Sequence, residues 1–208
     1  RSAEAIVAQS GIRHPGLSRN LREALTGDDP KAGSLLQQPF IEGAHPFVSA
    51  SDSLDSLRAT LLNSLFVDAI DTLPEGHEYR FPKNRHPYAH QLESWRLLAD
   101  ERPRSVLVTS GTGSGKTECF LFPILSSLLD EVTTTHEGLT GVQAIMLYPL
   151  NALIESQRER LSAWTGPFGG RVRYCLYNGD LPRAARDSDR RRTPEQVIDR
   201  EQLRSSPP

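Results

Sequence analysis

Apolar positions in the first half of the chain recur at the spacing of amphipathic helices. Leu17, Leu21 and Leu25 repeat every four residues and Gly27 follows them, which predicts a short helix over 16–27. Comparable patterns predict helices over 2–12, 52–71 and 88–101. Because this first part carries no residue pattern typical of a reaction, we expect residues 1–84 to form a mostly helical accessory region.

An irregular segment rich in Pro and Gly lies over 37–50, between two of the predicted helices. It contains Phe40 and Phe47. We expect these two aromatic side chains to anchor the segment to a neighbouring surface.

After residue 103 short, nearly continuous apolar runs alternate with amphipathic segments. The runs over 104–110, 142–149 and 171–180 predict strands, and the segments over 115–130 and 150–164 predict helices. Strands of a parallel sheet show continuous apolar runs because helices bury both faces. We therefore expect residues 85–208 to have an α/β fold, a parallel sheet flanked by helices.

Composition narrows the class of protein. Charged residues make up 24% of the chain and the formal net charge is −2, so no overall basic field attracts nucleic acid or an acidic membrane surface. No apolar run approaches the roughly 20 residues of a membrane span, so we expect no membrane partner. Cys119 and Cys175 match neither a disulfide framework nor a zinc pattern. They predict free thiols in a reducing, cytoplasmic compartment.

The stretch "TSGTGSGKTECF" over 109–120 predicts a phosphate-binding loop. Gly113 and Gly115 allow the backbone N–H groups to turn inward at the start of a helix, where the helix dipole favours an anion. Lys116 can reach the β- and γ-phosphates, and the Thr117 hydroxyl can bind Mg²⁺. An ordinary glycine turn is the alternative, and the strand–loop–helix context argues against it.

Two features of this loop leave its ligand open. Ser110 stands where the strict motif has Gly, and a small residue is tolerable there. The loop alone does not distinguish kinases, GTPases, transporters and motors.

Residues before the loop could select the base of the nucleotide. Gln91, 25 residues before Lys116, can pair with the N6 and N7 edge of adenine, and Tyr88 or Tyr79 can stack on the base. A surface glutamine on a helix is the alternative.

The ends of the second and third predicted strands form a further candidate site. Pro149 ends one strand and Asn151 begins a helix, a place where parallel sheets bind ligands. Asn151 either caps that helix or donates to a phosphate of a nucleic-acid backbone. Gly179 and Asp180 end the next strand at the same expected edge.

Four segments in this order, "YAHQ", "SGTGSGKTE", "YPLNALIESQ" and "YNGD", resemble the superfamily 2 helicases. They are similar to the adenine-reading Q motif, the Walker A motif, motif Ia and the segment after it. "YPLNALIESQ" resembles bacterial DEAD/DEAH-type helicases with a C-terminal DUF1998 domain, some of which act in DNA repair and others in antiphage defence. The N-terminal "PFIEG…PF" resembles the accessory region before their first motor domain.

The resemblance implies a RecA-like motor domain over 85–208, here only its first part, and the following site residues. Catalysis would involve Lys116 and Thr117, with Thr117 as the metal ligand. ATP would be held by Tyr88, Gln91, Thr112, Gly113, Ser114, Gly115, Lys116, Thr117 and Glu118. Single-stranded DNA would lie along Pro149, Leu150, Asn151, Gln157, Gly179 and Asp180. Asn151 stands where many relatives carry arginine, so its contact is less salt-sensitive.

Two charged stretches near the end of the chain are weaker candidates. The run Arg190-Arg191-Arg192 is interrupted by acidic neighbours, and a solvated loop is favoured over contact with DNA phosphates. Asp199-Arg200-Glu201 is no substitute for the family's Asp-Glu box, because no buried strand is predicted before it. The chain begins at Arg1 and ends at Pro207-Pro208, so we expect a part of a longer polypeptide.

Three functions are compared on these features. The favoured one is an ATP-dependent DNA helicase or translocase that hydrolyses ATP with Mg²⁺ as the full-length protein, in defence or repair. Residues 1–208 alone would bind ATP weakly and not hydrolyse it efficiently, because the carboxylate pair is missing. A nucleotide-sensing scaffold that binds partner proteins of a defence or repair complex is the second. A metabolic P-loop kinase is disfavoured by Gln91 and "YPLNAL".

Overall fold

The computed structural model describes residues 2–27, 46–135, 139 and 141–208. The chain divides into two compact units, residues 1–46 (unit 1) and 47–208 (unit 2). This division falls before the boundary expected between residues 84 and 85, and that boundary stays a prediction. Phe40 and the "PFIEG" segment lie outside the described residues.

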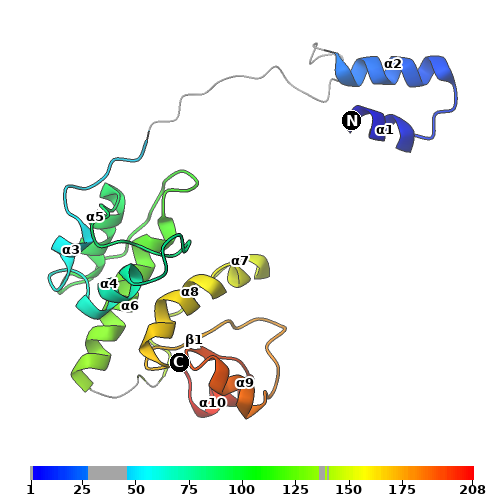
Figure 1. Cartoon of the computed structure of the whole chain (residues 1–208). Helices are drawn as coiled ribbons and strands as arrows, with labels where there is room; N and C mark the ends of the chain where they lie inside the picture. The colour runs from blue at the N-terminus through cyan, green and yellow to red at the C-terminus, as the bar shows by residue number, and fades with distance from the viewer. Residues whose placement is uncertain (1, 28–45, 136–138, 140) are drawn as a thin grey trace. The chain divides into compact units, whose positions relative to one another are not determined.

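Unit 1 is a pair of helices, α1 (Ser2–Gln9) and α2 (Pro15–Thr26), which pack against each other (Figure 1). Both match the predicted helices. His14 caps α2, since its Nδ1 accepts a hydrogen bond from the Leu17 N–H at 3.4 Å, and Pro15 fits the first helical turn. The Leu17 side chain is exposed.

The first part of unit 2 contains two short helices, α3 (Leu54–Leu57) and α4 (Ser64–Asp71). The prediction of one helix over 52–71 is wrong. Asn63 starts a new helix because its Oδ1 accepts hydrogen bonds from Leu65 N (2.8 Å) and Phe66 N (3.3 Å). Just before it, Ala59 has φ 60°, which breaks the helical backbone.

Helices α5 (Ala89–Leu98) and α6 (Lys116–Thr135) form the centre of unit 2 and pack closely on each other. Phe122 on α6 is fully buried at the middle of an aromatic cluster. Its ring centroid lies 5.0 Å from Phe66, 5.2 Å from Phe81, 5.2 Å from Trp95 and 5.1 Å from Trp164. These contacts hold four segments of the chain around α6.

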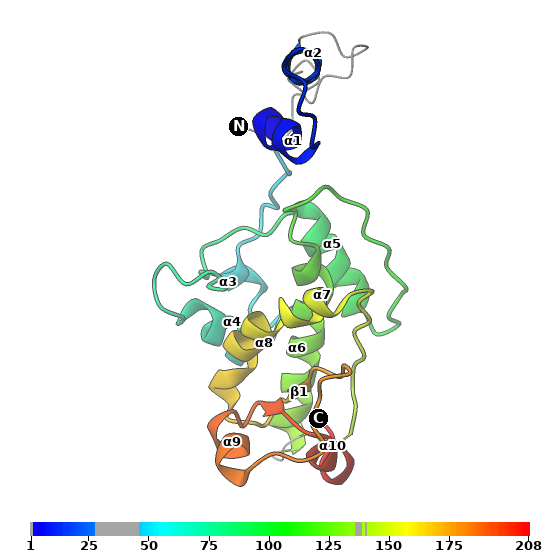
Figure 2. The ribbon, with the colours of Figure 1, turned by 90° about the vertical axis from the view of Figure 1, so that its right-hand side faces the viewer.

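The prediction of one helix over 150–164 is also wrong. Two helices replace it, α7 (Asn151–Glu155) and α8 (Arg158–Thr165), and they pass in front of α6 in Figure 2. A tighter turn separates them, because Gln157 N donates to the Ile154 carbonyl three residues earlier. A 3₁₀ turn (Gly166–Phe168) follows α8. Within the described part of the chain no helix has the length and apolar character that a membrane span requires.

The last part of unit 2 contains β1 (Tyr174–Cys175), α9 (Asp187–Arg192), β2 (Gln196–Val197) and α10 (Arg200–Ser205). β1 and β2 pair in parallel, with Tyr174 opposite Gln196. The strand predicted over 171–180 is thus reduced to two residues. The arginine run is helical and not a loop, although Arg191 and Arg192 are exposed to solvent as predicted. The prediction that no buried strand precedes Asp199 is wrong, because β2 does.

The strands predicted over 104–110 and 142–149 do not form in the described chain. Neither segment has regular secondary structure, and the side chains of Leu107 (88% exposed) and Leu147 (89%) face solvent. An isolated strand gains little, because its backbone groups need a hydrogen-bonded neighbour and its side chains a covering layer. The parallel sheet is therefore seen only as the β1–β2 pair, and the described structure is mainly helical.

Candidate functional site

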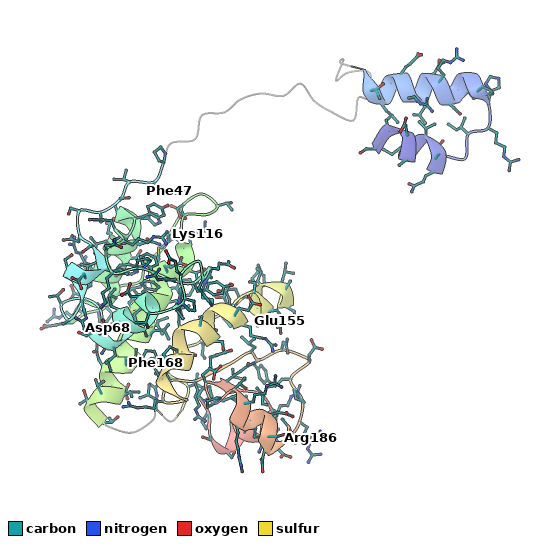
Figure 3. The ribbon with its side chains drawn as sticks, viewed as in Figure 1. Phe47, Asp68, Lys116, Glu155, Phe168 and Arg186 are labelled. Atoms are coloured by element: carbon teal, nitrogen blue, oxygen red, sulfur yellow. The ribbon has the colours of Figure 1, made fainter. Side chains whose placement is uncertain are left out.

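A cleft of about 740 Å³ opens at the start of α6, and we call it the nucleotide cleft. It is lined by the glycine-rich loop over 112–118, by Tyr88 and Gln91 from the start of α5, and by Tyr79 and Arg160. Figure 3 shows Lys116 at the same end of unit 2 as Phe47, away from Arg186. The structure thus brings together every residue predicted to hold ATP.

The loop has the backbone geometry of a cradle. Gly113 has φ 76° and Gly115 has φ 71°, a region that residues with side chains rarely adopt. A side chain at position 115 would also collide with Gln91 Nε2. A substitution at Gly115 would therefore strain the backbone and displace Gln91.

Lys116 spans the mouth of this loop. Its Nζ donates to the carbonyls of Ser110 (2.9 Å) and Gly111 (2.7 Å). Among the described residues, this ammonium group is held by backbone carbonyls alone, and it can exchange them for phosphate oxygens, which carry full charge. The residues present therefore fit a polyphosphate.

The described residues offer few ligands for a metal ion. The described residues contain no group of three His, Cys, Asp or Glu side chains placed to hold a metal ion. A Mg²⁺ ion bound through the Thr117 hydroxyl would depend on phosphate oxygens and water for its other ligands. That is the usual mode for Mg²⁺, which keeps several waters.

Ser110 has a structural role that the sequence did not indicate. Its hydroxyl lies 2.6 Å from the hydroxyl of Ser114, which is buried inside the loop. The Ser114 carbonyl is 2.8 Å from His90 Nε2 on α5. Serine in place of the usual glycine therefore supplies a hydrogen-bond partner across the loop.

Gln91 is buried and joins α5 to the loop. Its Nε2 donates to the Gly115 carbonyl at 3.0 Å, and its Oε1 accepts from Tyr88 N at 2.9 Å. The alternative of a surface glutamine is therefore wrong. One amide hydrogen and one oxygen lone pair remain, enough for a base edge. A second link between the helices runs from Trp95 Nε1 to the Glu118 carbonyl at 2.8 Å.

Aromatic residues border the cleft. Tyr88 stacks on His90 with ring centroids 5.7 Å apart, and Phe47 packs on both rings at 5.3 and 5.8 Å. The prediction that Phe47 anchors its segment is confirmed. Tyr79 is held by a hydrogen bond from Trp164 Nε1 to its carbonyl at 2.9 Å. Burial raises the pKa of Tyr79, so its hydroxyl stays protonated at neutral pH.

The residues predicted to contact nucleic acid lie outside the nucleotide cleft. Pro149, Leu150 and Asn151 are exposed where α7 begins. The N-cap of α7 is Leu150, with no side-chain hydrogen bond, so the interpretation of Asn151 as a cap is wrong. Gln157 is half-buried between α7 and α8, and its Oε1 accepts from Arg160 Nη1 at 2.8 Å.

Gly179 and Asp180 are exposed in a turn after β1, where Asp180 N donates to Asn178 Oδ1 at 3.1 Å. They do not line the cleft. Their predicted contact with DNA is thus neither supported nor opposed by their surroundings.

Arg160 is the functional candidate that the sequence did not reveal, since nothing in its spacing sets it apart from Arg158.

Both cysteines are free thiols. Burial raises the pKa of Cys119, and burial followed by the charge of Asp199 raises that of Cys175. Neither thiol is therefore a nucleophile at neutral pH. The chemistry of the site belongs to the loop and its neighbours.

Comparison with known proteins agrees with this geometry. Residues 88–201, more than half of the chain, match the model of the DEAD/DEAH box helicase family. The Druantia protein DruE of Escherichia coli (strain UMEA 4076-1) is 32% identical over 198 residues, which is 89% of this chain and 10% of DruE. The uncharacterized ATP-dependent helicase YprA of Bacillus subtilis (strain 168) is 27% identical over 104 residues, 50% of this chain and 13% of YprA.

No solved structure matches the chain. The chain spans only 10% and 13% of the lengths of the two relatives. What the comparisons show therefore concerns its family and not the whole protein's substrates. With its glycine-rich loop inside the matched residues, the chain is a member of the DEAD/DEAH box helicase family.

Proposed function

We propose that this chain is the ATP-binding front part of the first motor domain of an ATP-dependent DNA helicase or translocase. The observation that carries the proposal is the hydrogen bond from Gln91 Nε2 to the Gly115 carbonyl. This bond supports the proposal because it joins the Gln91 amide, proposed to read adenine, to the phosphate loop, and one nucleotide would span both. Family membership supports ATP and a divalent metal as the ligands.

In this proposal each group of the cleft has one task. Lys116 binds the phosphates in place of the Ser110 and Gly111 carbonyls, and Thr117 holds Mg²⁺ together with phosphate oxygens. Gln91 presents its remaining hydrogen and lone pair to adenine, with the ring of Tyr79 or Tyr88 beside the base. Bound Mg²⁺ would neutralise phosphate charge during hydrolysis.

Single-stranded DNA is the proposed second ligand. The exposed stretch Pro149, Leu150 and Asn151, with Gln157 behind it, offers neutral donors to a phosphate backbone. Gly179 and Asp180 are proposed to lie further along the same path. We propose hydrolysis as an activity of the full-length protein, since among the described residues no adjacent Asp-Glu pair lines the nucleotide cleft.

The full-length protein with Lys116→Ala tests this function. We expect DNA-stimulated ATP hydrolysis to fall by at least about a hundredfold, because the charged contact with the transferring phosphate is lost. Half-buried Lys83 has its own acidic partners, Asp68 and Asp71, and does not line the cleft, so Lys83→Ala is the matched control, with hydrolysis unchanged. Wild-type hydrolysis retained in Lys116→Ala would contradict the proposal.

A scaffold that binds partner proteins is the second candidate. The exposed apolar side chains of Ile6, Ile12 and Leu17 in unit 1 favour it, because such side chains often meet a partner. The same Lys116→Ala protein separates the two functions in a biological assay of antiphage defence or DNA repair. Loss of the biological activity supports the motor, and full activity without hydrolysis supports the scaffold.

A further inference from the structure

Arg160 lies between the nucleotide cleft and the segment proposed to contact DNA. It is on the first turn of α8, it lines the cleft, and its side chain is only 20% exposed. A guanidinium that is largely removed from water needs partners for five N–H donors. Which groups it contacts therefore indicates what it does.

On the side of the cleft, Arg160 faces Glu118 and Tyr79. Its Nη2 is 4.0 Å from Glu118 Oε1, and its guanidinium carbon is 5.4 Å from the centre of the Tyr79 ring. Glu118 follows Lys116 and Thr117 in the first turn of α6. A separation of 4.0 Å is an ion pair but too long for a hydrogen bond, so a small shift would tighten it.

On the opposite side, Arg160 holds the start of α8 to the turn after α7. Its Nη1 donates to Gln157 Oε1 at 2.8 Å. Burial raises the pKa of the Tyr148 hydroxyl, and the charge of Arg160 opposes that rise. Tyr148 directly precedes Pro149, where the exposed segment begins.

Two buried polar atoms in this region lack a hydrogen bond. Within the described chain, neither Arg160 Nε nor the Tyr148 hydroxyl has a partner. Unpaired buried donors are costly and mark places where a second arrangement can satisfy more of them. The Arg160 side chain could therefore exchange its present contacts for an arrangement that satisfies more of its donors.

We propose that Arg160 is a positioning residue that transmits the occupancy of the nucleotide cleft to the segment from Tyr148 to Gln157. This inference rests on the proposed function. Phosphates in the loop add negative charge next to Glu118, which draws the guanidinium toward the cleft. Its hold on Gln157 then changes, and the start of α7 responds. DNA bound along this segment acts in the reverse direction through the same side chain, because coupling between two sites is reciprocal.

The test measures how a nucleotide changes DNA affinity in the full-length protein. Fluorescence anisotropy of a labelled oligo-dT gives its Kd without nucleotide and with Mg²⁺ and a non-hydrolysable ATP analogue. We expect a ratio of the two Kd values of about fivefold or more in the wild type. In Arg160→Gln the ratio falls to within about twofold of one.

Two further variants make the result specific. Arg158→Gln is the matched control, since Arg158 lies on the same helix in an exposed pair with Glu155 at 2.8 Å, and we expect the wild-type ratio. Arg160→Lys keeps the charge but cannot contact Glu118 and Gln157 at once. We expect it to lower the ratio as Arg160→Gln does, and it decides the matter if Arg160→Gln unfolds.

The outcomes separate this inference from the function on which it rests. A wild-type ratio retained in Arg160→Gln or Arg160→Lys overturns the role of Arg160. A wild-type ratio of one, with both ligands bound, also overturns it, because no coupling exists to transmit. If the wild type binds neither ATP nor oligo-dT, the proposed function itself fails.

Discussion

Two of the arginine–carboxylate pairs in unit 2 differ in how firmly they are held. Arg190 donates to Asp199 through Nε (2.7 Å) and Nη2 (3.0 Å), and the Asp199 carboxylate is 0% exposed. Arg160 and Glu118 are 4.0 Å apart, and both border the nucleotide cleft. The groups of the first pair are bonded to each other within the protein, and the pair holds α9 to the start of α10. The second leaves donors for a ligand.

This difference shows that an ion pair in the fold is not by itself a sign of function. Asp199 also accepts from Gln202 N at 2.8 Å and so caps α10, which uses its remaining capacity inside the protein. Among the described residues, the Glu118 carboxylate has one ionic partner, the guanidinium of Arg160 at 4.0 Å. Removing Asp199 should therefore damage stability, whereas changes around the cleft should alter ligand binding.

The largest effect on stability is expected for Asp199→Ala. It leaves the Arg190 guanidinium without its main partner and removes the cap of α10, so we expect the free energy of unfolding to fall by about 3 kcal/mol. Chemical denaturation measures the change. Asp187→Ala is the control, because its exposed contact with Arg190 at 3.4 Å contributes about 0.5 kcal/mol or less. Equal losses in the two variants would contradict the distinction.

The same carboxylate predicts a defined dependence on pH. Burial alone would raise the pKa of Asp199, but hydrogen bonds from Arg190 and Gln202 N outweigh it and lower the pKa. A lowered pKa means that the stabilisation is complete above the ordinary aspartate pKa of about 4 and is lost as the pH falls through the folded-state value. We expect the stability difference between wild type and Asp199→Asn to shrink below about pH 4. A difference that stays constant down to pH 2 would oppose this.

A smaller change in stability is expected for Gln91→Ala, together with a change in ligand preference. The substitution removes the link to Gly115 and should cost about 1–2 kcal/mol. The preference for ATP over GTP in full-length hydrolysis should weaken, since no amide remains to select adenine. Glu93→Ala, an exposed change on the same helix, should leave both properties as they are. An unchanged preference in Gln91→Ala removes the adenine-reading role.

The smallest effect is expected for Ser110→Ala. It leaves the buried hydroxyl of Ser114 without its partner at 2.6 Å, which should cost about 1 kcal/mol. Thermal unfolding measures it, with Thr109→Ala at the exposed neighbouring position as control. If Ser110→Ala is as stable as the wild type, the bond across the loop does not contribute.

The sequence predicted helices better than strands, for a physical reason. A helix satisfies its backbone hydrogen bonds within one segment, so α2, α5 and α6 appear close to where the periodicity placed them. The apolar runs over 104–110 and 142–149 are equally clear in the sequence but need neighbouring strands. Where a polar side chain competes for the backbone, as at Asn63, even a continuous apolar stripe is divided into two helices.

The sequence predicted which residues form the candidate site, but not the contacts between them. Spacing placed Gln91 near the loop, yet the hydrogen bond to Gly115 depends on how α5 packs on α6. The partner of Ser110 and the position of Arg160 arise from contacts between separate segments. No local pattern contains them. The short strand β2 was missed because two residues carry no detectable periodicity.

Movement along a strand is the central claim, and displacement of streptavidin from a biotinylated single-stranded oligonucleotide by the full-length protein tests it most directly. We expect displacement that requires ATP and Mg²⁺ and that is lost in Lys116→Ala. Because no duplex is present, the assay applies to a helicase and to a translocase alike. Absence of ATP-dependent displacement by wild-type protein that binds both ATP and the oligonucleotide would contradict the account.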